Sequence, residues 1–336
     1  MPGPSFLKAA GLFILKLAVS IICLAWAVSQ IDFQNSIFSR PGAIDYRWLA
    51  LGAALAGITV ILTAIRWWFF LRAQNLPVSL GRSIELTMIG NLFSLVSLAG
   101  IGGDAARILL LIRDHPGRKL VITMAVLVDH LAGMVTLALL FFVISAAQFD
   151  ALANQSILGR EVIRFAWIYL GGGLLLVALM FLFASPPIHR HIHGNRRFAR
   201  WPLLERMPEI YDIYRRNWRH TLAGVACSFV MLFAFFLSFW CGLRAVGGTT
   251  SAATVITAMP VIDSISALPV TVAGVGVREK LFEVLMDDLA SVPPETAIAA
   301  SLAGFACNTL WALLGALFFL KKRDRIRVTE LKEADS

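Results

Sequence analysis

The sequence predicts an all-α polytopic membrane protein with six full spans and two re-entrant broken-helix hairpins, arranged as an inverted repeat. The chain is 58% hydrophobic and only 15% charged, with a mean hydropathy of +0.75. Soluble domains are only about 45–50% apolar, so this chain is too apolar to be one. Apolar runs of about 20 residues recur along it, and each is long enough to cross a bilayer as a helix. Two further apolar stretches, residues 83–113 and 251–289, are interrupted by glycine.

The full spans are expected at six apolar runs. The first run also has the layout of a signal peptide, with Lys8 before an apolar stretch. We interpret it as an uncleaved span, because the second half of the chain contains a counterpart. The six runs are residues 9–29, 48–71, 120–146, 163–184, 221–245 and 294–320.

The basic residues predict the orientation of the chain and indicate no nucleic-acid partner. The formal net charge is +9, and basic residues in short loops of membrane proteins gather on the cytoplasmic side. If the N-terminus is cytoplasmic and both broken stretches return to the side they came from, most of the 30 Lys and Arg residues lie inside. We therefore expect both termini in the cytoplasm, with residues 323–336 as a cytoplasmic tail.

The chain is expected to divide into two inverted repeats, residues 1–150 and 151–322. The segment LAGIG at 98–102 aligns with VAGVG at 272–276, and nearly the same spacing relates the spans on either side of each segment. Each half holds three crossings, an odd number, so the halves insert with opposite orientations. Inverted repeats with broken helices are typical of transporters.

Glycine and proline interrupt the two broken stretches, and each piece is too short to span the membrane alone. Backbone N–H and C=O groups cannot stay unpaired in hydrocarbon, so a break survives only where protein buries it or water reaches it. The breaks therefore predict a hydrated cavity near the middle of the membrane. The residues expected to form them are Gly100, Gly102, Gly103, Pro269, Gly274 and Gly276.

The helix after each break is expected to present its N-terminus to this cavity. One helix starts near Asp104 and the other near Val277 or Arg278, and a helix N-terminus favours an anion. Arg107 lies one turn inside the first helix, while Arg278 and Lys280 open the second. Guanidinium and ammonium groups bind phosphate, so these residues predict a site for a phospholipid head group.

Acidic residues beside these cations leave two interpretations open. In the first interpretation, Asp104 and Glu279 adjust the charge of the site or bind a proton. In the second, Asp104 pairs with Arg107 one turn away, and Glu279 neutralises Arg278 or Lys280. In that case the charged triplet Arg278, Glu279 and Lys280 reaches the outer membrane interface instead of a cavity.

Four more polar residues are expected to support the cavity. Asp263 precedes the second break. Asp129 and His130 fall early in a span, as a polar pair against the first hairpin or as a proton relay. Arg66 ends the second span, where the alternative is an interfacial anchor. We expect no metal ion or other cofactor, since the four cysteines lie in apolar runs without a Cys-x-x-Cys pair.

Three motifs resemble those of the flippase-like family named after the lysylphosphatidylglycerol synthase transmembrane region. GIGGDAARILLL at 100–111 is similar to its Gly-Gly-Asp-x-x-Arg signature, LPVTVAGVGVREKLF at 268–282 to its second signature, and AIRWWFFL at 64–71 to its Arg-Trp element. The chain departs from the family at two places. It has Ser97-Leu98-Ala99 where members usually have proline before the first glycine pair, and Asp129-His130 where they often have Asp-Arg.

The resemblance implies a lipid flippase or scramblase, not an enzyme, in the bacterial plasma (inner) membrane. Its partners would be phospholipids or modified phospholipids, with a proton or another ion as a candidate for coupling. Aminoacyl-transferring members carry a large soluble domain after the membrane part, and we expect this chain to be a stand-alone member without it. Two other functions stay open: a lipid-linked glycosyltransferase in the membrane, and an ion-coupled carrier of a small anion.

Overall fold

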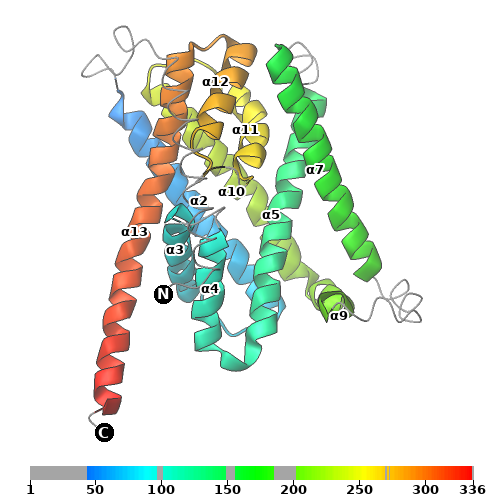
Figure 1. Cartoon of the computed structure of the whole chain (residues 1–336), viewed down its shortest axis with the longest axis vertical. Coiled ribbons are helices and arrows are strands. Elements are labelled where there is room, and N and C mark those ends of the chain that lie inside the picture. Colours follow the sequence, from blue (N-terminus) through cyan, green and yellow to red (C-terminus); the bar gives the residue numbers. More distant parts are fainter. Residues whose placement is uncertain are drawn as a thin grey trace, which may run out of the picture.

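The fold is all-α, as predicted, and the elements pack side by side (Figure 1). The computed structural model describes residues 44–96, 101–148, 156–184, 202–268, 271 and 273–334. The predicted first span at 9–29 lies outside these residues. The helices in the described part are α2 (Tyr46–Ala73), α3 (Leu80–Val96), α4 (Ile101–Asp114), α5 (Lys119–Ala147), α7 (Ile157–Ala184), α9 (Pro202–Arg216), α10 (Trp218–Ala245), α11 (Ala252–Ser266), α12 (Val277–Ala290) and α13 (Pro294–Ala334).

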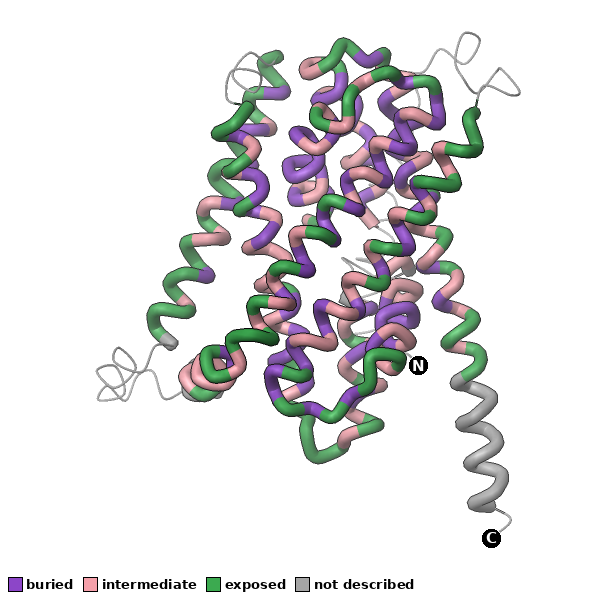
Figure 2. Tube along the Cα trace, turned by 180° about the vertical axis from the view of Figure 1, so that it is seen from behind, coloured by how far each residue is buried: buried purple, intermediate pink, exposed green. Residues whose placement is uncertain are grey.

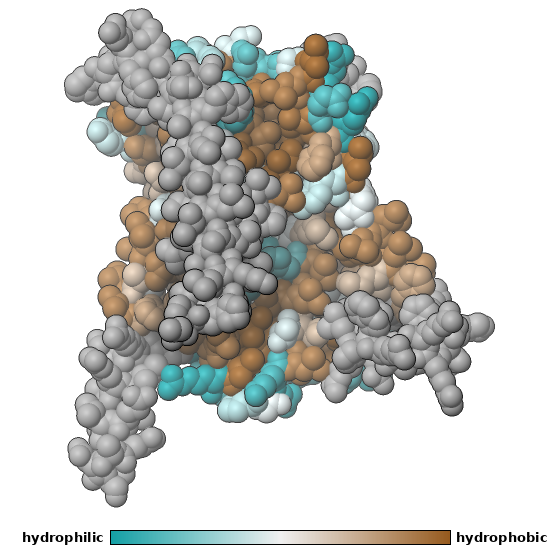
Figure 3. All heavy atoms as spheres, viewed as in Figure 1, coloured by the Kyte–Doolittle hydropathy of each residue, from teal (hydrophilic) through white to brown (hydrophobic). Residues whose placement is uncertain are grey.

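Five segments in the described part are long and apolar enough to cross a membrane. They are helices at the positions of the other five predicted spans, and most of them extend the predicted range by a few residues. The segments are Tyr46–Ala73, Pro116–Ala147, Ile157–Phe183, Trp218–Ala245 and Pro294–Lys321. Hydrophobic residues form the middle of the molecular surface and hydrophilic residues gather toward its two ends, as a bilayer requires (Figure 3).

The core of the molecule is the contact between α2 and α10, which pack along each other. Small residues permit this approach, as is usual between membrane helices. A Cβ added at Gly224 on α10 would lie 2.8 Å from the Phe70 ring on α2. A Cβ added at Gly52 on α2 would lie 3.2 Å from the side chains of Cys241 and Cys307. Buried residues concentrate in these central helices, while the outer helix α7 is largely exposed (Figure 2).

Each of the two broken stretches forms a pair of short helices. The first stretch becomes α3 and α4, which pack against each other in the lower half of Figure 1. The second becomes α11 and α12, which pack against each other in the upper half. The two helices of each pair have 14 to 17 residues, fewer than a full span needs.

The backbone breaks differ in part from the prediction. The second lies where expected, because Ala273, Gly274 and Gly276 have φ angles of 52°, 74° and 87°, in the left-handed region that favours glycine. Gly102 and Gly103 do not form a break, since α4 already begins at Ile101. Gly103 is needed there for close packing, as an added Cβ would lie 2.5 Å from the Gly90 carbonyl on α3. Gly100 and Pro269 lie outside the described residues.

The two halves of the chain make matching contacts. α3 packs on α13, and α11 packs on α5, so each short-helix pair contacts the long helix that ends the other half. The indole Nε1 of Trp68 donates to the Val78 carbonyl at 2.9 Å, ten residues later. The indole Nε1 of Trp240 donates to the Thr250 carbonyl at 3.0 Å, again ten residues later.

The structure also holds a helix between two of the predicted spans. Between the spans predicted at 163–184 and 221–245, α9 occupies Pro202–Arg216. Tyr214 on α9 is buried against Phe70, with ring centroids 6.2 Å apart, and its hydroxyl donates a hydrogen bond of 2.6 Å to the Gln74 side-chain oxygen. Polar residues alternate with apolar ones along this segment of the sequence, so it contains no long apolar run that would predict a span.

Candidate functional site

A polar cavity of about 460 Å³ lies where both short-helix pairs meet the long helices. Residues from seven helices line it, from α2 near the start of the described chain to α13 near its end. The polar residues that define it here are Thr63, Asn91, His130, Asp263, Arg278 and Asn308. The volume lies within the range of about 300–1,000 Å³ that is usual for small-molecule sites.

Arg278 is the cation of this cavity. It lies in the first turn of α12, directly after the break at Gly274 and Gly276. The left-handed backbone of these glycines therefore sets the position of its Cα atom. Its Nη2 donates to the Ala273 carbonyl at 3.0 Å, and the guanidinium lies over the Phe305 ring, 4.9 Å from the centroid. The other terminal nitrogen, Nη1, has no hydrogen-bond partner among the described residues.

Further hydrogen-bonding atoms around the cavity also lack partners. Ser266, Thr271 and Thr309 also line the cavity, and their buried hydroxyls, like Arg278 Nη1, have no partner in the described part of the chain. Ser266 is 6% exposed and Thr271 is 2% exposed. A buried polar atom that stays unpaired costs about 1–3 kcal/mol, so these atoms are suited to a hydrated ligand or to water.

Asp263 gives the cavity its carboxylate. It interacts electrostatically with Arg278, yet the two side chains form no ion pair within the described residues. Neither side chain is therefore tied to the other by an ion pair, and their opposite charges face the same cavity.

The other two charges of the predicted triplet point elsewhere. The carboxylate of Glu279 is fully buried, where it accepts from the Gly276 N–H at 2.5 Å and from the Ser301 hydroxyl at 3.2 Å. It therefore caps α12, as in a capping box. Lys280 pairs with Glu283 at 2.7 Å and does not line the cavity. Of the triplet, the structure brings only Arg278 into the cavity.

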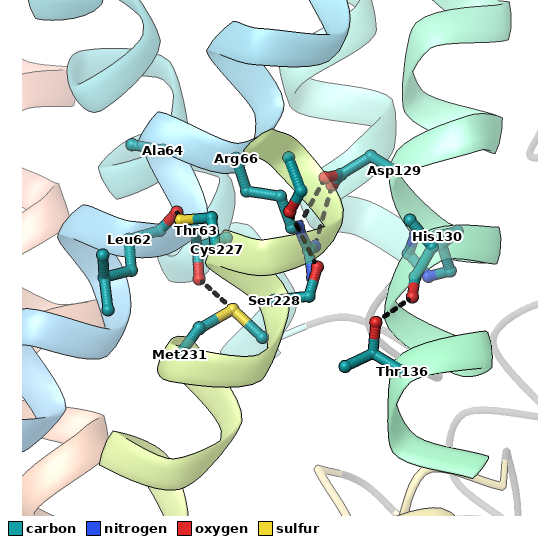
Figure 4. Close-up of polar contacts among 12 residues, drawn as sticks. Leu62, Thr63, Ala64, Arg66, Asp129, His130, Thr136, Cys227, Ser228 and Met231 are labelled. Atoms are coloured by element: carbon teal, nitrogen blue, oxygen red, sulfur yellow. Dashed lines mark hydrogen bonds and ion pairs between the residues drawn. The ribbon is translucent and has the colours of Figure 1, made fainter. Parts of the chain in front are cut away.

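A second group of charges lies beside the cavity, buried between α2 and α5. Arg66 binds Asp129 through two contacts, Nε to Oδ1 at 2.7 Å and Nη2 to Oδ2 at 3.1 Å (Figure 4). The Asp129 side chain is fully buried, and Arg66 is 7% exposed. Arg66 is thus no interfacial anchor, and neither residue lines the cavity.

The chain of ion pairs continues from Asp129 to the cavity. Arg107 on α4 lies 3.5 Å from the second oxygen of Asp129 and also pairs with Asp104 one turn earlier. Its guanidinium lies over Trp67, 5.0 Å from the ring centroid. The other oxygen of Asp104 lies 3.2 Å from Nδ1 of His130, which lines the cavity.

The predicted site is therefore divided into two parts that meet at His130. Arg278 and Asp263 lie in the cavity, whereas Arg66, Asp129, Arg107 and Asp104 neutralise one another beside it. Asp104 and Arg107 pair with each other, which is the second of the two interpretations that the sequence left open for them. Among the described residues, no group of three or more His, Cys, Asp or Glu is placed to bind a metal.

Sequence reasoning missed the uncharged part of the cavity lining. Ser266, Thr271 and Thr309 are small hydroxyl residues, and such residues are common in membrane helices without any functional role. Asn91 and Asn308 lie in apolar stretches of the sequence, but their sequence positions do not reveal that both face the same space. Only the packing of α3 against α13 brings them together.

The comparisons with known proteins agree with the motifs. Residues 13–316 match the family described as the lysylphosphatidylglycerol synthase TM region. No curated protein and no solved structure was found to match. Because the match covers most of the 336 residues, the chain belongs to the family of the lysylphosphatidylglycerol synthase transmembrane region.

Proposed function

We propose that this protein moves a phospholipid, or a modified phospholipid, between the two leaflets of a membrane. The observation that carries the proposal is the polar cavity, which holds Arg278 together with buried polar atoms that have no partner among the described residues. The phosphate of the head group would bind Arg278, and its polar substituents would bind the hydroxyl and amide groups around it. The acyl chains would stay in the lipid, against exposed apolar side chains such as those of α7.

The short-helix pairs support an entry path from each leaflet. A helix of 14 to 17 residues is about 21–26 Å long at 1.5 Å per residue, less than the roughly 30 Å of hydrocarbon. The α3–α4 and α11–α12 pairs lie in opposite halves of the molecule (Figure 1). We propose that they are re-entrant hairpins that enter from opposite faces and meet at the cavity.

The matching contacts of the two halves support an inverted repeat. The pairs α2 and α10, α3 and α11, α4 and α12, and α5 and α13 would be the equivalent elements. Trp68 and Trp240 then occupy the same place in their repeats, each donating to a carbonyl ten residues later. Two opposed copies give both leaflets a similar route to one cavity, which suits passage of a head group in either direction.

The basic residues support a cytoplasmic lower face in Figure 1. The connection from α4 to α5, which holds Arg118 and Lys119, lies at this end, and so does α9 with Arg215 and Arg216. Short basic loops mark the cytoplasmic side of membrane proteins. We propose that the protein lies in a bacterial plasma membrane, with both termini in the cytoplasm.

Reconstitution into vesicles with labelled phospholipids tests this function. Arg278→Ala removes the only guanidinium of the described cavity lining, so we expect translocation to fall at least tenfold, the equivalent of about 1.4 kcal/mol. Arg278→Lys keeps the charge but loses the planar fork, and should retain an intermediate rate.

The matched control is Arg164→Ala on α7. Arg164 is exposed, pairs with Glu161 at 3.1 Å and lies outside the cavity, so its rate should equal that of the unchanged protein. Equal rates for Arg278→Ala and the unchanged protein would refute the head-group role of Arg278. Uptake of inorganic phosphate without lipid movement would replace the proposal by a carrier of small anions.

A further inference from the structure

A second cavity, of about 70 Å³, lies between α5, α7, α9 and α10, and only apolar atoms face it. One water molecule needs roughly 10–15 Å³, yet a cavity without hydrogen-bonding partners stays dry. Two of the hydroxyl residues in its lining bond elsewhere. The Thr221 hydroxyl donates to the Tyr214 carbonyl at 3.1 Å, and the Tyr214 hydroxyl donates to Gln74. This apolar cavity is therefore suited to an apolar occupant.

Two of the long apolar helices form the walls of the apolar cavity. α5 supplies Leu127 and Leu131, and α7 supplies Met180 and Phe181. The Phe181 ring lies 6.4 Å from that of Tyr211, which belongs to α9 and also lines the cavity. Phe181 is 43% exposed, so the cavity reaches the outside of the helix bundle. In a membrane, hydrocarbon chains of lipids surround this surface.

The apolar cavity is separate from the polar one. Val128 and Leu131 line the apolar cavity, whereas His130, between them on α5, lines the polar cavity. The two cavities have no lining residue in common. An occupant of the apolar cavity would therefore leave the surroundings of Arg278 unoccupied.

α9 closes the apolar cavity at the lower end of α7 (Figure 1). Its two sides differ in character, because Ile210 and Tyr211 line the cavity while Arg215 and Arg216 are exposed. Amphipathic helices with basic residues on the polar side lie in the plane of the membrane interface. Trp218, at the start of α10, is 57% exposed, and tryptophan is enriched at this level of a membrane. α9 thus indicates where lipid head groups meet the protein.

Two positive charges beside the apolar cavity are not balanced by a carboxylate. Arg215 pairs with an acidic residue one turn earlier, at 3.5 Å. Arg216 and Arg219 are exposed and form no ion pair within the described residues. They lie within two residues of Tyr214 and Thr221, which line the cavity. Guanidinium groups bind phosphate oxygens, so this end of the cavity favours an anionic head group.

We propose that the apolar cavity is a second lipid site, which holds one acyl chain of an anionic phospholipid while Arg216 and Arg219 bind its phosphate. Head group and chain of a phospholipid join at the membrane interface, the level at which α9 lies. Two unbalanced positive charges favour a lipid with a net negative charge over a zwitterionic one. The bound chain fills the space between α5 and α7. This site needs no movement of lipid between leaflets, so it is independent of the proposed function.

Photo-cross-linking in nanodiscs tests the second lipid site. The probe is phosphatidylglycerol with a diazirine in the middle of one acyl chain, added in trace amounts to phosphatidylcholine nanodiscs that hold the full-length protein. Peptide mass spectrometry should find the label on residues 124–131 of α5 and 180–181 of α7. Met180→Trp fills the cavity, and Arg216→Gln/Arg219→Gln removes the unbalanced charges, so each should lower this labelling about tenfold.

Two variants of α7 provide matched controls. Leu175→Trp adds the same ring at a position that is 61% exposed and outside the cavity. Arg160→Gln/Arg164→Gln removes two exposed arginines near the other end of the helix. Both should be labelled like the unchanged protein. The melting temperature in detergent checks that Met180→Trp folds, and the variant with Arg216 and Arg219 replaced tests the site by itself if it does not.

Three results would overturn the inference. Equal labelling by phosphatidylcholine with the same diazirine would show that the cavity takes a chain from any lipid. Labelling that avoids residues 124–131 and 180–181 would show that no chain enters. A dimer that Met180→Trp dissociates would place a second copy of the chain there instead. Failure of lipid translocation in vesicles would refute the proposed function and leave this labelling, and hence the second lipid site, intact.

Discussion

Arg66 has a single acidic partner in the described residues, Asp129, whereas Asp129 has two arginines. The Arg66 Nε and Asp129 Oδ1 are 2.7 Å apart, and Arg107 approaches the other oxygen of Asp129 to 3.5 Å. The pair joins α2 to α5, and its extension through Arg107 joins both helices to α4. Because Asp129 has two arginine partners and Arg66 has one acidic partner, replacing Asp129 and replacing Arg66 should cost different amounts of folding free energy.

We predict that Asp129→Leu destabilises the protein more than Arg66→Leu does. Removal of Asp129 leaves Arg66 buried without a counter-charge, which costs about 3–5 kcal/mol. Removal of Arg66 leaves Asp129 next to Arg107, so the loss should be smaller. Thermal unfolding in detergent measures both effects.

The double variant Arg66→Leu/Asp129→Leu should be less destabilised than the sum of the two single changes, because it leaves no unpaired charge between this pair. Additive losses in the double variant would contradict the role of this ion pair in the fold.

We also predict that Gly274→Ala displaces the side chain of Arg278. Gly274 has a φ of 74°, and an added Cβ would lie 2.9 Å from the Ser266 carbonyl and 3.0 Å from Nη2 of Arg278. The strained backbone alone costs about 1–3 kcal/mol. The melting temperature in detergent and the affinity for dihexanoyl phosphatidylglycerol should both fall.

Gly172 on α7 is the control for this substitution. It lies in a helix, and an added Cβ would meet nothing within 4 Å. Gly172→Ala should therefore leave binding unchanged and stabilise the protein by up to about 1 kcal/mol. If Gly274→Ala and Gly172→Ala behaved alike, the left-handed turn before α12 would not be what positions Arg278.

A third prediction concerns water in the polar cavity. In a variant with Cys23, Cys227, Cys241 and Cys307 replaced by alanine, Asn91→Cys and Asn308→Cys should react with a charged methanethiosulfonate added from water. Both positions are partly exposed and line the cavity, although they lie in long apolar stretches. Mass spectrometry of the intact protein would count the modified thiols.

Ser228→Cys supplies the buried comparison. Ser228 is fully buried on α10, and its hydroxyl bonds the Gly224 carbonyl at 3.2 Å away from the cavity. Its thiol should stay unmodified under conditions in which the other two react fully. Protection of Asn91→Cys and Asn308→Cys to the same degree would show that the cavity is dry.

The spans could be predicted from the sequence because hydrocarbon thickness fixes their length. α2, expected at 48–71, occupies Tyr46–Ala73, and α5, expected at 120–146, occupies Lys119–Ala147. The end of α13 was not predictable in this way. The apolar run ends near residue 320, but the helix continues to Ala334. A helix can extend into water beyond the apolar residues that cross the membrane, so the end of the apolar run does not mark the end of the helix.

The site was predictable only where residues lie close together along the chain. Asp104 and Arg107 pair across one turn, as their spacing suggested. Arg66 and Asp129 are 63 residues apart, and the sequence left open whether Arg66 supports the cavity or anchors a span at the membrane interface. The roles of Arg278, Glu279 and Lys280 depend on how α12 is rotated, which the consecutive charges do not reveal.

The polar cavity is shared between two stretches of chain far apart in sequence. Asn91 and His130 come from its early part, while Asp263, Arg278 and Asn308 come from its late part. A change of ligand preference therefore has to satisfy both walls at once, and substitutions that are harmless singly become incompatible in combination. Evolution of a new cargo would consequently leave correlated changes in the two halves, with few isolated ones.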